Sequence, residues 1–121
     1  MSPAKQKRIA ELNDQLRARI QTPVFGEAFP PGAVYLTRGV ASLGPAAQII
    51  ACAMVQNFDG FTADNDPYGE HDFGAFSLPG GERLFWKIDY YADAECEYGS
   101  EDPSDPVKSY RVLTIMLAEE Y

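Results

Sequence analysis

Apolar residues recur along this chain with two different spacings, and the spacings predict an order of helices and strands. Near the N-terminus a stripe with steps of three and four residues predicts a helix over residues 3–20. The members of this stripe are Ile9, Leu12, Leu16 and Ile20. Ser2 and Pro3 suit the start of the helix, because a hydroxyl caps free amides and proline is accepted in a first turn.

The next two segments continue this alternation of elements. Residues 33–40 are rich in β-branched and aromatic side chains and predict a strand. Gly44 and Pro45 then open a second helix, which we expect to extend to residue 58. Its expected buried face consists of Ala46, Ile49, Ile50, Ala53 and Met54.

The second half of the chain predicts an antiparallel meander. Residues 72–78 and 83–91 are extended runs joined through a Pro-Gly-Gly turn, which is typical of a hairpin. Period-two alternation places Trp86 on the apolar face of the second run, so we interpret it as a core residue. Residues 110–118 favour a third strand, although their apolar spacing also fits a helix.

The register of the hairpin stays open at this stage. An even-numbered loop centred on residues 80–81 would place Asp72 opposite Asp89, an unfavourable pair unless a proton or a cation lies between them. An odd-numbered loop would instead set Phe76 opposite Trp86 and remove that conflict.

Together these elements predict one α+β domain over residues 1–121. The expected order is helix, strand, helix, strand, strand, strand, with the two helices packed on one face of a small antiparallel sheet. A chain of 121 residues, 45% of them hydrophobic, is long enough to bury a core without staples. No apolar run approaches the ~20 residues that a membrane span requires, so we expect a cytoplasmic protein that does not contact membranes.

Charge is distributed unevenly along the chain, and this narrows the class of partner. Residues 1–38 carry a net charge of +3, from six basic and three acidic residues, whereas residues 39–121 carry −11, from four basic and fifteen acidic residues. A nucleic-acid binder needs a basic face, which this body lacks. An acidic body favours the basic surface of another protein and disfavours direct contact with nucleic acid.

The acids concentrate in two turn-rich stretches, residues 57–72 and 93–106. Because a hairpin brings the start of its first strand beside the end of its second, we expect both stretches to lie at the same end of the sheet. Aromatic residues among these charges are typical of a protein-binding surface. The predicted interaction surface consists of Asp59, Asp64, Asp66, Tyr68, Glu70, Asp72, Asp93, Glu95, Glu97, Glu101, Asp102 and Asp105.

Known catalytic and metal motifs fail when they are compared with this sequence. Residues 64–69 resemble the start of a calcium loop, but the fifth position is Tyr68 and the twelfth, which requires glutamate, is Ala75. Zinc spacing, a nucleophile elbow and a glycine-rich phosphate cradle are also missing from the sequence. We therefore assign no catalytic residue and no cofactor.

One alternative is centred on His71, the only histidine. A looser site for a hard cation would use Asp64, Asp66, His71 and Asp72, and the same imidazole could serve as the general base of a small hydrolase. The competing interpretation is that His71 is a hydrogen-bonded structural residue, because no catalytic partner is identifiable.

Three stretches, NDPYGEHDFGAF, FWKIDYY and RVLTIMLAEEY, resemble a small bacterial family known only as a domain of unknown function, often met on plasmids and mobile elements. The resemblance implies no activity, cofactor or catalytic residue. It implies a bacterial, cytoplasmic setting and an accessory role such as blocking a host-defence system.

The leading hypothesis is a non-enzymatic protein that presents clustered carboxylates to a basic protein surface. One form of it is a nucleic-acid mimic that inhibits a nucleic-acid-binding defence protein. A third hypothesis, beside the metal-binding or hydrolytic one, is a subunit that buries its apolar faces in a homo-oligomer.

Overall fold

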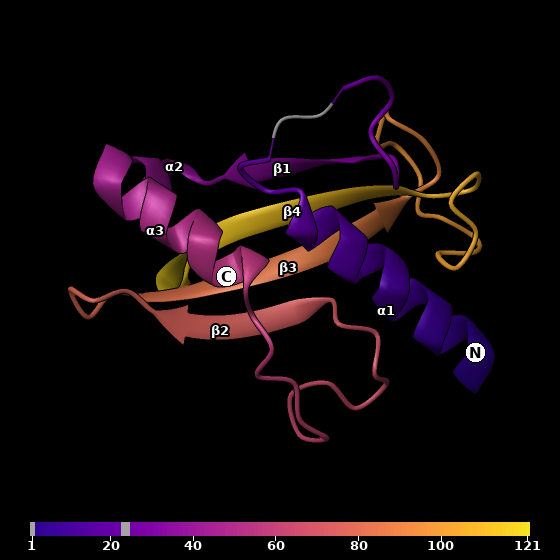
Figure 1. Cartoon of the computed structure of the whole chain (residues 1–121), viewed down its shortest axis with the longest axis horizontal. Helices are drawn as coiled ribbons and strands as arrows, with labels where there is room; N and C mark the ends of the chain where they lie inside the picture. Colours follow the sequence, from indigo (N-terminus) through magenta and orange to yellow (C-terminus); the bar gives the residue numbers. More distant parts are fainter. Residues whose placement is uncertain (1, 23–24) are drawn as a thin grey trace.

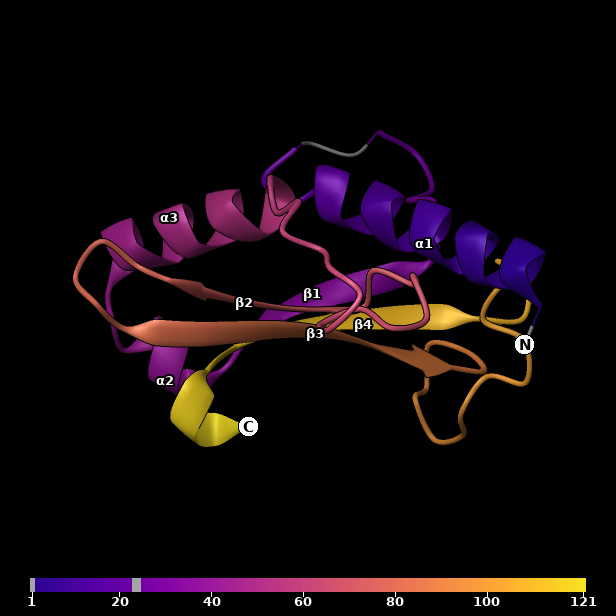
Figure 2. The same cartoon turned by 90° about the horizontal axis from the view of Figure 1, so that it is seen from below.

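The computed structural model describes residues 2–22 and 25–121, and it is an α+β fold in which helices cover one face of a four-stranded sheet (Figures 1 and 2). The elements in chain order are α1 (Pro3–Ala18), β1 (Gly32–Leu36), α2 (Arg38–Ala41), α3 (Pro45–Gln56), β2 (Phe73–Ser77), β3 (Arg83–Tyr91), β4 (Tyr110–Leu117) and the short 3-10 helix η1 (Ala118–Glu120). In Figure 2, α1 and α3 lie on one side of the sheet, while α2 and η1 lie on the other side at one end. The predicted fold class is confirmed.

Helix α1 forms as its sequence predicts. The Ser2 hydroxyl caps it by accepting a hydrogen bond from the amide of Lys5, and all four residues of the predicted apolar stripe are buried. Two polar side chains, Asn13 and Arg17, are buried on the same face. Such side chains are costly to bury unless they are hydrogen-bonded, so their partners become important for the site.

The predicted buried face of α3 is wrong. Ile49 and Ile50 are 60% and 40% exposed, whereas Ala51 and Val55 are fully buried. This helix is apolar around most of its circumference, so the spacing of apolar residues alone does not select the face that packs on the sheet. Docking against the core selects it.

The sheet is mixed, which corrects the expectation of a purely antiparallel sheet. Its strand order is β1-β4-β3-β2, with β2, β3 and β4 forming the predicted antiparallel meander and β1 pairing in parallel with β4. The predicted strand 33–40 also ends early, at Leu36, because the hydroxyl of Thr37 caps the short helix α2. Pairing on both edges makes β4 a central strand, in keeping with the full burial of Leu113 and Ile115.

The hairpin loop is odd-numbered, as in the second alternative that the sequence left open, but the pairing differs from the expected one of Phe76 with Trp86. The loop has five residues between the pair Ser77 and Arg83, and Gly74 lies opposite Trp86. A β-carbon on Gly74 would lie 2.2 Å from Nε1 of Trp86, so the fully buried indole requires a glycine at this position. Asp72 does not face Asp89, because its carbonyl accepts from the amide of Ile88.

Candidate functional site

The stretch 57–72 is held as a compact loop by its own side chains. Asp66 accepts hydrogen bonds from the amides of Glu70 and His71, and His71 adopts a left-handed backbone conformation with φ of 57°. Thr62 and Asn65 close a second turn through reciprocal bonds between side chain and backbone. Part of the Asp and Asn content of this stretch therefore serves turn formation.

The imidazole of His71 lies between groups from two segments. Its Nδ1 is 2.9 Å from Oδ1 of Asp14 on α1, and its Nε2 is 3.7 Å from Oδ2 of Asp66. The ring stacks on Phe61, with centroids 3.9 Å apart and an interplanar angle of 2°. No hydroxyl or thiol of the described residues hydrogen-bonds to the ring, so this arrangement supplies a base without a nucleophile to activate.

Arg17 ties the same loop to the end of α3. One guanidinium nitrogen donates to the carbonyls of Val55 and Phe58, and the other pairs with Asp14 at 2.8 Å. A cation placed here satisfies carbonyls that the end of a helix leaves free. The guanidinium also lies 5.0 Å from the ring centroid of Trp86, an aromatic face that favours a cation.

A second polar group, the Asn13 network, joins α1 to both predicted acidic stretches. The amide nitrogen of Asn13 donates to the carbonyl of Glu70 at 2.9 Å and to the hydroxyl of Tyr90 at 2.8 Å, and its oxygen accepts from Nε of Arg111 at 2.6 Å. Tyr90 in turn donates to Asp72 at 3.3 Å. Asn13 is thus the point at which the two stretches are connected.

Arg111 carries the Asn13 network into the second stretch. It is fully buried, and it donates to the hydroxyl of Ser109 and to the carbonyl of Pro103. No carboxylate among the described residues pairs with it. Burial lowers the pKa of Arg111 to about 10, which leaves it charged near neutral pH.

Three neighbouring groups of the Asn13 network have raised pKa values. Burial is the main cause for Asp72, whose pKa is raised further by the charge of Asp66 although the Tyr90 hydrogen bond lowers it in part. Burial also raises the pKa of Glu70, and the charges of Asp72 and Asp66 add to the effect. The Tyr90 phenol has a strongly raised pKa, again mainly through burial, and remains a hydrogen-bond donor.

The residues of the predicted interaction surface fall into two groups. Members of the first group are half-buried and bonded, or packed against the fold: Asp66, Glu70, Asp72, Asp102 and Asp105. Members of the second group are exposed: Asp59, Asp64, Tyr68, Asp93, Glu95, Glu97 and Glu101.

The two stretches are linked indirectly. Helix α1 lies between them in Figure 1, and Lys5 near its start pairs with Asp102 at 3.3 Å. Over the described part of the chain, no hydrogen bond or ion pair joins a side chain of residues 57–72 directly to one of residues 93–106. The structure brings together Asp66, Glu70 and Asp72 but not the whole predicted set.

The alternative cation site is not assembled as predicted. Within residues 2–22 and 25–121, no three His, Cys, Asp or Glu side chains form a group that could hold a metal ion. Asp66 is engaged by backbone amides and His71 by Asp14, while Asp64 is exposed. In the same described ranges, no helix is long and apolar enough to cross a membrane.

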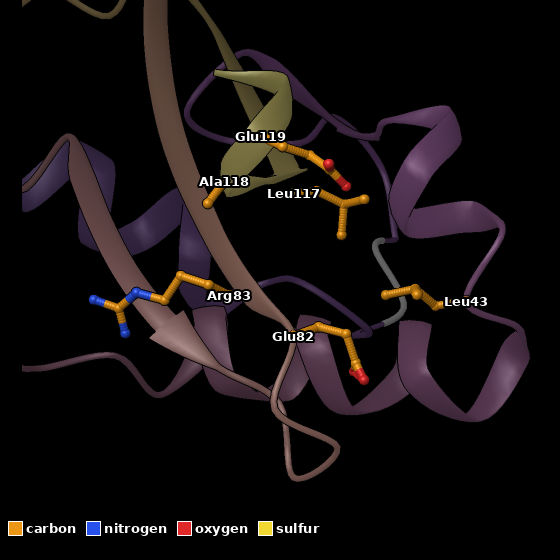
Figure 3. A pocket seen from close by; sticks show the side chains of 6 residues that line it. All are labelled: Leu43, Glu82, Arg83, Leu117, Ala118 and Glu119. Atoms are coloured by element: carbon orange, nitrogen blue, oxygen red, sulfur yellow. The ribbon is translucent and has the colours of Figure 1, made fainter.

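A pocket of about 350 Å³ lies at the opposite end of the sheet from the 57–72 loop, between the start of β3, η1 and the segment before α3 (Figure 3). Leu43, Leu117 and Ala118 form its apolar part, and Figure 3 shows Arg83 extending away from the other labelled side chains. Glu82, Arg83 and Glu119 also line it, and it contains neither a histidine nor a thiol.

Sequence reasoning missed the three α1 residues of the site, Asn13, Asp14 and Arg17. A signal was present, since Asn13 and Arg17 directly follow Leu12 and Leu16 of the apolar stripe and so border the buried face. Their partners outside α1, however, lie more than thirty positions away in the sequence.

Comparison with known proteins places the chain in a family. The DUF3768 family, described as proteins of unknown function, matches residues 36–120. Apart from Tyr121, the match includes the three stretches that carried the resemblance, and it leaves out α1. No curated protein and no solved structure matches the chain. Because the matched residues make up more than half of the sequence, this protein belongs to the DUF3768 family.

Proposed function

We propose that the protein is a non-enzymatic interaction protein that presents exposed carboxylates to a basic surface of another protein. The observation that carries this proposal is a set of exposed acids that form no ion pair with any described cation. The set consists of Asp59, Asp64, Asp93, Glu95, Glu97 and Glu101.

The contrast with the other acids supports the proposal. Asp66 and Asp102 are half-buried and accept hydrogen bonds from backbone amides, so their charges serve the fold. Of the exposed set, Asp93 accepts one such bond, from the amide of Glu95. Glu95, Glu97 and Glu101 have no such side-chain contact in the described structure, and their mutual repulsion opposes compactness. A complementary basic surface would relieve that repulsion, steer association and fix orientation.

A more specific form of the proposal is mimicry of nucleic acid. Carboxylates on exposed loops would occupy the basic face with which a nucleic-acid-binding protein contacts phosphates. In a bacterial cytoplasm such a protein would inhibit a host-defence system by competing for that face. The protein itself would not contact nucleic acid, because like charges repel.

The test compares two variants with the same change in net charge. One carries Glu95→Gln, Glu97→Gln and Glu101→Gln. The control removes three carboxylates that lie outside the acidic stretches, by replacing Glu11, Glu27 and Glu82 with glutamine. Both variants and the unchanged protein are immobilised and used to capture proteins from a bacterial lysate at low and high salt.

We expect the captured partners to be basic and to dissociate from the unchanged protein at high salt. The control should still capture these partners, whereas the first variant should not. Elution of the same partners by duplex DNA would support mimicry, whereas insensitivity to DNA would refute that form alone. Equal capture by both variants, or capture that resists high salt, would refute the interaction surface.

A further inference from the structure

One face of the sheet, here called the outer face, lies opposite α1 and α3, and no helix of residues 2–22 and 25–121 crosses its centre. In Figure 2 it is bounded by α2 and η1 at one end and by the first part of the β3–β4 connection at the other. Strand alternation places on it Tyr35, Phe73, Phe85, Tyr91, Val112 and Thr114. Tyr35 is 57% exposed.

The outer face is hollowed rather than flat. An open cavity of about 630 Å³ lies on it, with a floor that includes Val112, Thr114 and Met116. Tyr121 closes one side and packs edge-on against Phe85, with ring centroids 5.5 Å apart. Thr37, Lys87, Asp89 and Glu120 also line it, so the hollow mixes charged groups with apolar and aromatic ones, a combination that occurs in protein-binding grooves.

The charges around the hollow are mostly negative. The backbone bond from Ala92 to the carbonyl of Tyr98 closes a tight loop over residues 93–97, which contains three exposed acids and continues from the end of β3. At the other end η1 contributes Glu119 and Glu120. The lysine on the floor, Lys87, is neutralised by Asp89 at 2.9 Å.

These charges select the kind of occupant. A second copy would bring acidic ends together, because each chain has a net charge of −8 and both ends of the hollow are acidic. Like charges placed face to face cost affinity, whereas a basic partner gains from the same arrangement. Charge complementarity therefore favours a partner that is apolar in its middle and basic at its ends.

The dimensions suit a helix. The eight residues of β4 extend over about 27 Å at ~3.4 Å per residue. An α-helix of that length has about 18 residues at ~1.5 Å each. Helices already cover the inner face, and a helix with one apolar stripe is a common way to cover the second face of a sheet.

We propose that the outer face is the docking site for an amphipathic helix of a partner protein, with an apolar stripe and Lys or Arg at both ends. The inference rests on the proposed function, because it gives the acidic loop a defined place in the interface. It adds an apolar contact that the acidic loops alone do not require.

The probe is a synthetic 18-residue helical peptide, of about the length derived above, with a leucine stripe and lysines at both ends, titrated into the full chain by fluorescence anisotropy. Thr114→Lys and, as a second variant, Tyr35→Lys place a cation on the outer face. Ile49→Lys makes the same charge change on exposed α3. A scrambled peptide of the same composition is the matched control for the probe.

We expect the probe to bind the unchanged protein at least about tenfold more tightly than the scrambled peptide does. Thr114→Lys and Tyr35→Lys should each weaken binding of the probe by at least about tenfold, and Ile49→Lys should not. Thermal melts confirm that each variant folds. Equal binding of both peptides, or no loss in either outer-face variant, would overturn the proposal. Concentration-dependent dimerisation that Thr114→Lys abolishes would assign the face to a second copy and overturn it as well.

The test separates this proposal from the proposed function. If the variant lacking Glu95, Glu97 and Glu101 loses its captured partners while Thr114→Lys keeps them, the proposed acidic surface is supported and the proposed helix site is refuted. If neither variant loses them, both proposals fall.

Discussion

Replacing Asn13 by alanine is the sharpest test of how the two acidic stretches are connected. The side chain is fully buried on α1 and makes three hydrogen bonds to three different segments. Its loss leaves Nε of the buried Arg111 and the carbonyl of Glu70 without these partners. The substitution removes contacts that no local element replaces.

The magnitude follows from the kinds of bond that are lost. A hydrogen bond to a charged group contributes about 1.5–3 kcal/mol and a neutral one about 0.5–1.5 kcal/mol. The bond from Arg111 is of the first kind, and the bonds to Glu70 and Tyr90 are of the second. Alanine returns roughly 0.5 kcal/mol through its helix propensity. We expect a net loss of about 3 kcal/mol, a large part of the typical 5–15 kcal/mol of a domain.

The assay is urea unfolding followed by fluorescence and circular dichroism. Trp86 is the single tryptophan and is fully buried, so its emission reports on the core. Gln15→Ala, at an exposed position of the same helix, is the control and should change the free energy of unfolding by less than about 0.5 kcal/mol.

The outcome that refutes the reasoning is a loss for Asn13→Ala as small as that for Gln15→Ala. A stronger check is a double-mutant cycle with Arg111→Met. Because the two side chains share a bond, the double variant should lose less stability than the sum of the single variants. Simple additivity would mean that the network does not act as a unit.

Three further outcomes are expected. Gly74→Ala should lower stability by about 1–3 kcal/mol and shift the emission of Trp86, because the added carbon meets the indole; unchanged emission and stability would contradict the hairpin register. Burial raises the pKa of Asp72, so the protonated carboxyl stabilises the fold fully below the ordinary pKa of 3.8, and this stabilisation is lost as pH rises through the raised pKa. Asparagine does not titrate, so the melting temperature of Asp72→Asn should rise relative to that of the unchanged protein from acid to neutral pH. The hydrogen bond from Thr37 lowers the pKa of Glu120, so Glu120→Gln should show the opposite trend: its melting temperature is lower than that of the unchanged protein at neutral pH, and the difference disappears as pH falls through the lowered pKa. For either variant, a difference in melting temperature that does not change with pH would contradict the assigned pKa shift.

The family match and the site overlap only in part. Tyr90 and Arg111 lie within the matched residues 36–120, whereas Asn13 and Arg17 lie on α1, outside them. In this chain the buried Arg111 of the matched part therefore has one of its hydrogen-bond partners, Asn13, on a helix that the match does not include.

Local patterns in the sequence were sufficient for the elements whose signals are strong. The apolar stripe of α1, its Ser2 cap, the hairpin of β2 and β3 and the inward-facing Trp86 are all as predicted. Residues 110–118 favoured a strand over a helix, and β4 confirms this preference. Each of these features depends on spacing or on a turn within a few residues, which is information that a short segment contains.

Features that depend on distant parts of the chain required the tertiary structure. The buried face of α3 was predicted incorrectly because most of its faces are apolar, and the parallel pairing of β1 with β4 joins strands separated by more than seventy residues. The hairpin register depends on the fit of Gly74 under Trp86 rather than on the turn alone.

The acidic stretches show the same division. The sequence by itself determined that they are acidic, rich in turns and close to the strands β2, β3 and β4. Only the tertiary structure decided which carboxylates serve the fold and which are exposed, because that depends on partners from other elements, such as Lys5 for Asp102 and Tyr90 for Asp72. Burial and hydrogen bonding are properties of the assembled core, and no local pattern specifies them.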